Sequence, residues 1–241
     1  MRTFFEKFFL FAALSVCVCA SSHAQDKMRI VVYGDGITAG SQVRLGEAYY
    51  SRLYHKLKDI GYDNVDVFNM SVDGQSTSRS VEMLDEVLAK QPDIVVVQLG
   101  SSDMLRGVNT DLIYRNLTDI ISKLQQHRVY VILIGVKAPE GMGYTYGRQI
   151  EAVFERLVTF FRVPFYRDAL EGIVGNPDLT LADGFHPNGK GIDLIVERTY
   201  LTVDAMLRAR WRMLNDQRGY QPPTDEALPP AMPSAAARAV P

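Results

Sequence analysis

Residues 94–103 read IVVVQLGSSD, and this stretch decides the fold. Its first part, Ile94 to Gln98, is a short and mostly β-branched run without a helical period. Such a run is typical of a strand that is buried on both faces of a parallel sheet. Gly100 and three small polar residues follow at the point where the strand would end. Since ligands bind at the carboxyl ends of the strands in open α/β sheets, this loop is expected to border a site.

Strands and helices are predicted to alternate along most of the chain. The other predicted strands are 28–33, 65–70, 130–136 and 163–166. Helical spacing of apolar residues predicts helices over 46–59, 77–89, 112–124, 148–161 and 191–213, with Thr110 as the N-cap of the third. This alternation indicates an α/β protein. We expect a three-layer α/β/α sandwich around a central, mostly parallel five-stranded sheet.

Composition and charge describe an ordinary globular protein. The chain has 241 residues, of which 47% are hydrophobic and 22% charged, and one domain over 25–215 is expected. The formal net charge is −2, with acidic and basic residues interspersed. No basic stripe of the kind that neutralises phosphates is present, so nucleic acid is not expected as a partner.

The first 24 residues resemble a secretory signal peptide. A short cationic start precedes an apolar stretch, and small residues around Ala24 would allow cleavage before Gln25. The apolar stretch is short for a membrane span, so an exported protein in the periplasm or medium, without stable membrane insertion, is expected. A retained anchor and a lipoprotein remain alternatives. Because Cys17 and Cys19 both lie in this segment, the mature chain forms no disulfide and no thiolate metal site.

Two other segments carry predictions of their own. Residues 221–241 are rich in proline and alanine without apolar periodicity, so a disordered tail is expected. Phe160 and Phe161 are predicted to belong to the core rather than to a lipid groove. The stretch from Tyr144 to Arg148 either lines a pocket or forms a solvated helix start.

Three further clusters of glycine and polar residues fall at expected loop positions. They are Gly34 to Gly40 (GDGITAG), Ser71 to Gly74 (SVDG) and Asp183 to Asn188 (DGFHPN). Asp35 and Asp103 follow strands, where aspartate commonly accepts hydrogen bonds from loop amides. We therefore interpret both as residues that shape loops.

In order and spacing, the four clusters resemble the blocks of the SGNH (GDSL) hydrolases, especially their acyl thioesterase, lysophospholipase and arylesterase (TesA-like) branch. The resemblance covers nearly the whole mature domain and is strongest from Val95 to Gly107 and in the DGFHPN run. It implies a flavodoxin-like fold and hydrolysis of esters or thioesters without a cofactor or metal.

The resemblance also assigns positions in the site. Asp183 and His186 match the acid and base, although a histidine that caps the last helix near Asn188 is the alternative interpretation of His186. The nucleophilic serine is replaced by Gly36, which has no hydroxyl for a covalent acyl-enzyme. The backbone amides of Gly36 and Gly74 would form the oxyanion hole, with Ser102 where the family has an asparagine.

Three functions follow as hypotheses. The first is a catalytically impaired or inactive envelope protein, expected to be a monomer, that binds an acyl or acetylated ester, or a protein partner. The second is an active ester or thioester hydrolase that uses a water activated by His186 or a relocated serine. Ser102 is favoured for that role over the more distant hydroxyls of Thr38, Ser41 and Ser71. The third, a dinucleotide-binding domain prompted by the glycines of residues 34–40, is disfavoured because their spacing is one residue too long.

Overall fold

The computed structural model describes residues 27–40 and 42–217. Its centre is one parallel sheet with the strand order β2-β1-β3-β4-β5. The strands are β1 (Met28–Gly34), β2 (Val65–Asn69), β3 (Ile94–Gln98), β4 (Tyr130–Ile134) and β5 (Phe165–Tyr166). This order is the flavodoxin-like arrangement of doubly wound folds. The predicted five-stranded α/β sandwich is therefore confirmed.

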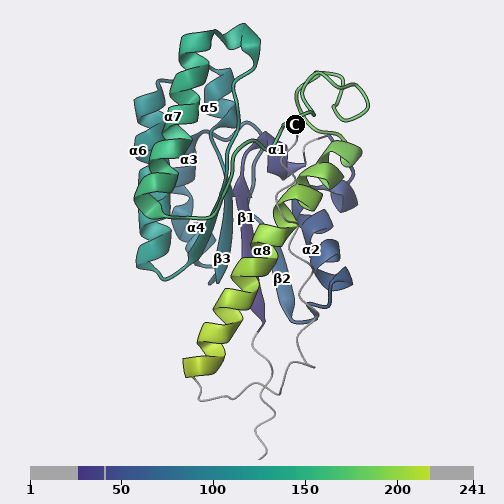
Figure 1. The fold of residues 1–241 in the computed structure, drawn as a ribbon, viewed down its shortest axis with the longest axis vertical. Helices are drawn as coiled ribbons and strands as arrows, with labels where there is room; N and C mark the ends of the chain where they lie inside the picture. The colour runs from purple at the N-terminus through teal and green to yellow at the C-terminus, as the bar shows by residue number, and fades with distance from the viewer. Residues whose placement is uncertain (1–26, 41, 218–241) are drawn as a thin grey trace, which may run out of the picture.

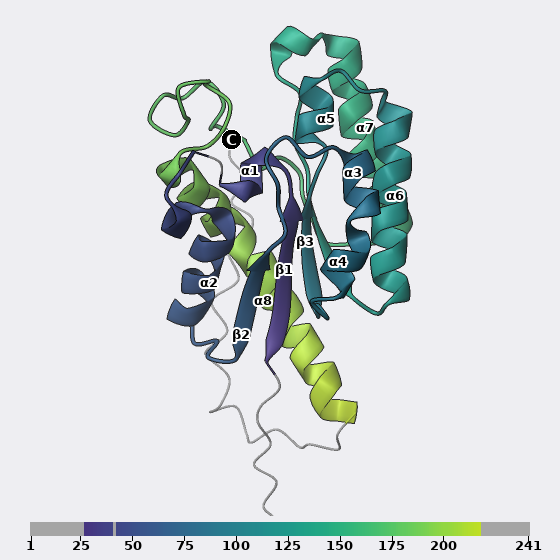
Figure 2. The ribbon, with the colours of Figure 1, turned by 180° about the vertical axis from the view of Figure 1, so that it is seen from behind.

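Helices cover both faces of the sheet (Figures 1 and 2). One layer pairs α2 (Tyr49–Asp59) with the long α8 (Gly189–Gln217), and the other contains α3 (Thr77–Glu82), α4 (Leu84–Leu88), α6 (Thr110–Gln126) and α7 (Tyr144–Phe161). Two short helices, α1 (Gly36–Ala39) and α5 (Ser101–Leu105), directly follow β1 and β3. Two 3-10 turns, η1 (Leu45–Glu47) and η2 (Glu140–Met142), complete the elements.

The core lies on both faces of the sheet. All five residues of β3 are fully buried, because this strand runs between two neighbours and beneath both helix layers. Leu53 and Leu57 of α2 are packed on one side, and Ile113, Leu117 and Ile120 of α6 belong to the same apolar cluster. The apolar runs of β1, β3 and β4 thus correspond to largely buried strands, whereas the edge strands β2 and β5 are only partly buried.

Several predicted boundaries need correction. The N-cap of α6 is Asn109, whose side chain accepts a hydrogen bond from the Asp111 amide, and Thr110 is the first helical residue. The segment 77–89 is two helices, because the backbone at Met83 has ψ 0° and interrupts the helical path. The helix predicted to begin at 46 begins at Tyr49, since Ala48 is extended.

At the far edge of the sheet the pairing is shorter than predicted. β4 ends at Ile134, and β5 has only two residues. Pro164 precedes β5 and has no N–H, so it contributes only its carbonyl oxygen, which accepts a hydrogen bond from Leu133. The helix predicted from 148 begins instead at Tyr144, which is 84% exposed, so this end of the stretch is a solvated helix start.

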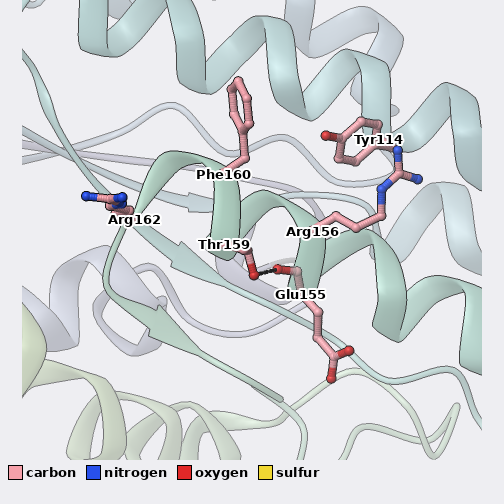
Figure 3. Close-up of a pocket in the computed structure, with 6 residues that line it drawn as sticks. All are labelled: Tyr114, Glu155, Arg156, Thr159, Phe160 and Arg162. Carbon is pink, nitrogen blue, oxygen red and sulfur yellow. Dashed lines mark hydrogen bonds between the residues drawn. The ribbon is translucent and has the colours of Figure 1, made fainter.

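The prediction that Phe160 is a core residue is wrong. Its side chain is 70% exposed, whereas Phe161 packs against the core as expected. Figure 3 shows Phe160 projecting from α7 beside a cavity, while Arg156 reaches over the ring of Tyr114 at 3.8 Å from its centroid. Helical spacing lets only one of two consecutive aromatic residues face the sheet. The cavity contains no residue of the four polar clusters.

The expected signal peptide and the expected tail lie outside the described residues, as does Ser41. Among the helices of the described part, none is long and apolar enough to cross a membrane.

Candidate active site

The four polar clusters come together at the carboxyl edge of the sheet. β1 lies between β2 and β3, so the loops that follow these three strands are neighbours. α1 begins directly after β1, at the same end of the sheet as α5 and the loop that leads into α8 (Figure 1). The topology therefore assembles residues that are about 150 positions apart in the sequence at one edge, as expected for this fold class.

The end of β1 needs a glycine at position 34, because other segments of the same chain approach its backbone closely. A Cβ built on Gly34 would lie 2.0 Å from Thr38 Oγ1 and 2.7 Å from the carbonyl oxygen of Gln98. No side chain fits in that space.

Asp35 joins the first and third clusters. Its buried carboxylate accepts hydrogen bonds from the Ser101 amide at 2.8 Å, the Ser101 hydroxyl at 2.5 Å and the Ser102 amide at 3.2 Å. It also accepts from Ile37 and caps α1. Burial raises the pKa of Asp35, and these hydrogen bonds oppose that rise. Asp35 therefore shapes the loop, as expected, rather than reacting.

Asp103 and Arg106 join the third cluster to the second. The buried Asp103 carboxylate accepts from the Thr77 amide at 2.7 Å and the Thr77 hydroxyl at 3.3 Å. Burial raises the pKa of Asp103, although its hydrogen bonds to Thr77 and the charge of Arg106 oppose this. The Arg106 guanidinium donates to the Gly74 carbonyl at 2.9 Å, which fixes the Gly74 peptide at the edge of the site.

The acid and base positions are joined. Asp183 Oδ2 lies 2.5 Å from His186 Nδ1, and Asp183 Oδ1 accepts from the amides of Phe185 and His186, each at 2.9 Å. Gly184 has φ +69°, which allows the tight turn between the two side chains. Burial of Asp183 would raise its pKa, but the hydrogen bonds from His186 and Phe185 outweigh it and the pKa is lowered.

The alternative interpretation of His186 as a helix cap is not what the geometry shows. Asn188 caps α8 instead, since its side chain accepts from the amides of Lys190 and Gly191 at 3.0 and 3.1 Å. With Nδ1 of His186 facing Asp183, Nε2 is the ring nitrogen left for chemistry. This is how an aspartate orients a histidine in triad enzymes.

Nε2 of His186 faces Gly36. A Cβ built on Gly36 would lie 2.8 Å from that nitrogen and 2.7 Å from Asp73 Oδ1. The base is therefore directed at the position from which a serine hydroxyl would react, and the space above the glycine is bordered on another side by a carboxylate. Gly36 itself has no group that could form an acyl-enzyme.

Two backbone amides remain available at this position. In the described part of the chain, neither the Gly36 nor the Gly74 N–H donates to a protein acceptor. Gly74 has φ +69°, which favours glycine. The Ser102 side chain is nearly buried, and among the described residues its hydroxyl has no hydrogen-bond partner. Such free donors are what an oxyanion or another acceptor group needs.

The hydroxyls of Thr38 and Ser71 are less well placed than that of Ser102 to act as a nucleophile. Thr38 is fully buried, and its hydroxyl lies 3.0 Å from the hydroxyl of Ser71. These two hydroxyls hydrogen-bond to each other. Across residues 27–40 and 42–217, there is no group of three or more His, Cys, Asp or Glu side chains that could hold a metal ion.

Sequence reasoning missed two contributors to this site. Asp73 lies within one of the clusters, but only the folded chain shows that its carboxylate borders the space above Gly36. Arg106 follows the third cluster, and its bond to the Gly74 carbonyl connects elements that are 32 residues apart. No local pattern signals either contact. The one indication in the sequence was that Asp73 is the neighbour of Gly74, a residue of the predicted oxyanion hole.

Known proteins with similar sequences include two bacterial esterases. The chain is 29% identical over 185 residues to an arylesterase from Vibrio mimicus, covering 76% of this chain and 91% of the relative. It is also 29% identical over 182 residues to the esterase TesA of Pseudomonas aeruginosa, covering 74% and 89%.

Solved structures agree. A crystal structure of TesA matches with a TM-score of 0.71 and 27% identity, covering 74% of this chain and 99% of that one. The psychrotrophic esterase EstA from Pseudoalteromonas, inhibited by monoethylphosphonate, matches with a TM-score of 0.70 and 25% identity over 75% and 98%. The model of the GDSL-like lipase/acylhydrolase family matches residues 32–194. The chain therefore belongs to the GDSL-like lipase/acylhydrolase family, the SGNH hydrolases.

Proposed function

We propose that this protein binds an acyl or acetylated ester in the SGNH cleft and has lost the serine-dependent route of its relatives. Hydrolysis, where it occurs, is slow and proceeds by direct attack of a water molecule activated by His186. The observation that carries this proposal is Gly36, because a residue without a hydroxyl stands where His186 Nε2 is directed.

The rest of the site supports binding of a carbonyl group. The free amides of Gly36 and Gly74 suit a carbonyl oxygen, and Asp183 keeps the imidazole of His186 oriented. In the water route, the water oxygen bonds to the carbonyl carbon while its proton passes to Nε2. The carbon–oxygen bond to the leaving group then breaks, and the same proton passes to the departing alkoxide.

Impaired catalysis is expected from two positions of the site, Gly36 and Ser102. A triad enzyme stripped of a member keeps roughly 10³-fold catalysis over water, so activity far below that of an intact family member is expected. Ser102 has a shorter side chain than asparagine, and losing one oxyanion donor costs on the order of 10²-fold. Both changes affect the chemical step more than binding.

A relocated serine is the second candidate route. Ser102 has a free hydroxyl in the site, but no hydrogen bond joins it to His186 among the described residues. A nucleophile needs its base within hydrogen-bond reach. The geometry therefore favours water over Ser102.

The place of action belongs to the same proposal. The signal-like residues 1–24 support export to the cell envelope, where acylated or acetylated ligands, or a protein partner of the envelope, would meet the cleft of a monomer.

Hydrolysis of short- and medium-chain nitrophenyl esters by the purified protein tests the proposal, alongside His186→Ala and Gly36→Ser. We expect slow turnover that His186→Ala abolishes and that Gly36→Ser raises. Direct binding of the same esters to the His186→Ala variant, which should not hydrolyse them, checks that the cleft still holds them. Turnover at the rate of an intact esterase, or ester binding too weak to detect, would contradict the proposal.

A further inference from the structure

Asp73 is a charged group at the site with no structural task. Its side chain is exposed, and among the described residues it forms no hydrogen bond or ion pair. Other aspartates of the same loops behave differently, since Asp35 and Asp103 are buried and accept several hydrogen bonds. The carboxylate of Asp73 is therefore free to bind something outside the protein.

Its position defines what it would bind. Asp73 Oδ1 and His186 Nε2 lie 2.7 and 2.8 Å from the same point, the place of an absent Cβ on Gly36. An unbonded group cannot occupy this point itself, because it lies one bond length from Gly36 Cα, but a small group just beyond it lies beside both side chains. It has to donate to the carboxylate, which only accepts, and to a neutral imidazole nitrogen, which also accepts. Water has these two donors and keeps its lone pairs for a third partner.

We propose that Asp73 is a catalytic residue that holds the attacking water above Gly36, between its own Oδ1 and His186 Nε2. This inference rests on the water route of the proposed function. It names Asp73 as the second side chain, beside His186, that contacts the attacking water. One water proton points at Nε2 and the other at Oδ1, so a lone pair of the oxygen points at the ester carbonyl carbon. That fixed orientation supplies what a serine side chain otherwise provides by its covalent attachment.

The step balances without a further reactant. A bond forms between the water oxygen and the carbonyl carbon, and the proton on the His186 side passes to Nε2. The proton on the Asp73 side stays with the oxygen, which becomes part of the carboxylic acid product. When the bond to the leaving alcohol breaks, the proton on His186 passes to that oxygen.

The same placement makes Asp73 an obstacle to a serine at position 36. The built Cβ lies closer than 3.0 Å to both Asp73 Oδ1 and His186 Nε2, so both side chains must shift before a larger residue fits, and removal of Asp73 relieves one of the two contacts. Its carboxylate would also oppose the negative charge that develops on the ester oxygen next to Gly74. Removal of Asp73 is therefore expected to have opposite effects in the two backgrounds.

The test compares Asp73→Ala and Asp73→Asn in the unmodified protein and in Gly36→Ser, with nitrophenyl acetate as the probe. In the unmodified protein, we expect Asp73→Ala to lower kcat by about tenfold or more, with Asp73→Asn in between because its amide oxygen still accepts. In Gly36→Ser, we expect Asp73→Ala to raise kcat. Asp63→Asn serves as the control, since it removes an exposed carboxylate before β2 and should change neither rate.

The outcomes separate the inference from the function on which it rests. Hydrolysis that His186→Ala abolishes but that both Asp73 variants leave unchanged would overturn the role of Asp73 alone. Hydrolysis no faster than that of His186→Ala would overturn the water route and the inference with it. Equal losses from Asp73→Ala in both backgrounds would indicate a structural role, and thermal unfolding of each variant identifies any that fail to fold.

Discussion

The two halves of the candidate site differ in what they retain. The loop before α8 keeps both side chains of the acid–base pair, with Asp183 2.5 Å from His186. The loops after β1 and β3 offer less for chemistry, because Gly36 has no side chain and Ser102 carries only a hydroxyl, at the positions where the proposed function places the lost nucleophile and an oxyanion donor. The scaffold survives since Asp35 holds it through the amides of Ser101 and Ser102, not through the side chain at position 36. The contacts that hold these loops therefore do not depend on a side chain at position 36.

The largest expected effect comes from placing a nucleophilic serine at position 36, in the loop after β1. Gly36→Ser combined with Asp73→Ala should raise kcat for nitrophenyl acetate by at least about 10²-fold over the unmodified protein, because loss of the serine of a triad costs up to about 10⁶. Steady-state kinetics and a burst of nitrophenol would report the new acyl-enzyme. A folded double variant without a burst would mean that the two halves no longer fit together.

The oxyanion side should respond next. Ser102→Asn, added to Gly36→Ser, is expected to raise kcat by roughly a further tenfold or more, since an amide reaches further than a hydroxyl as a donor. The measurement is kcat with KM compared separately. A change confined to KM would show that position 102 contacts the ground state only.

The scaffold of the altered half can be tested through stability. Asp35→Ala should lower the free energy of unfolding by about 2–4 kcal/mol, because the buried donors of Ser101 and Ser102 lose their acceptor. Urea unfolding, with the exposed Asp63→Ala as control, measures this. A loss equal to that of the control would show that Asp35 does not hold the loop.

The smallest effect concerns the retained half. The folded state lowers the pKa of Asp183, so its carboxylate stabilises the fold above the ordinary value of 3.8, and this contribution is lost as the pH falls through the lowered pKa. Because Asp183 is 41% exposed, the contribution is at most about 1 kcal/mol. The Tm advantage over Asp183→Asn should therefore shrink between pH 7 and pH 3. An advantage that grows on acidification would contradict the direction of the shift.

Sequence patterns predicted the sheet well because its central strands are mostly apolar runs, as Ile94 to Gln98 illustrates. They predicted less where a boundary depends on one residue, such as the capping of α6 by Asn109 or the orientation of Phe160. The roles of Gly36, Ser102 and the Asp183–His186 pair were expected from the resemblance to the SGNH hydrolases and stay predictions. Asp73 could not be found in this way, since its contact with the site depends on side-chain placement across two loops.

The central claim is that hydrolysis in this protein forms no acyl-enzyme. Incubation with a fluorophosphonate ester, followed by intact-protein and peptide mass spectrometry, tests it most directly, because such reagents attach to an activated serine. We predict no covalent adduct on the unmodified protein and an adduct at position 36 in the Gly36→Ser variant. An adduct on Ser102 of the unmodified protein, abolished by His186→Ala, would contradict the claim and identify a relocated nucleophile.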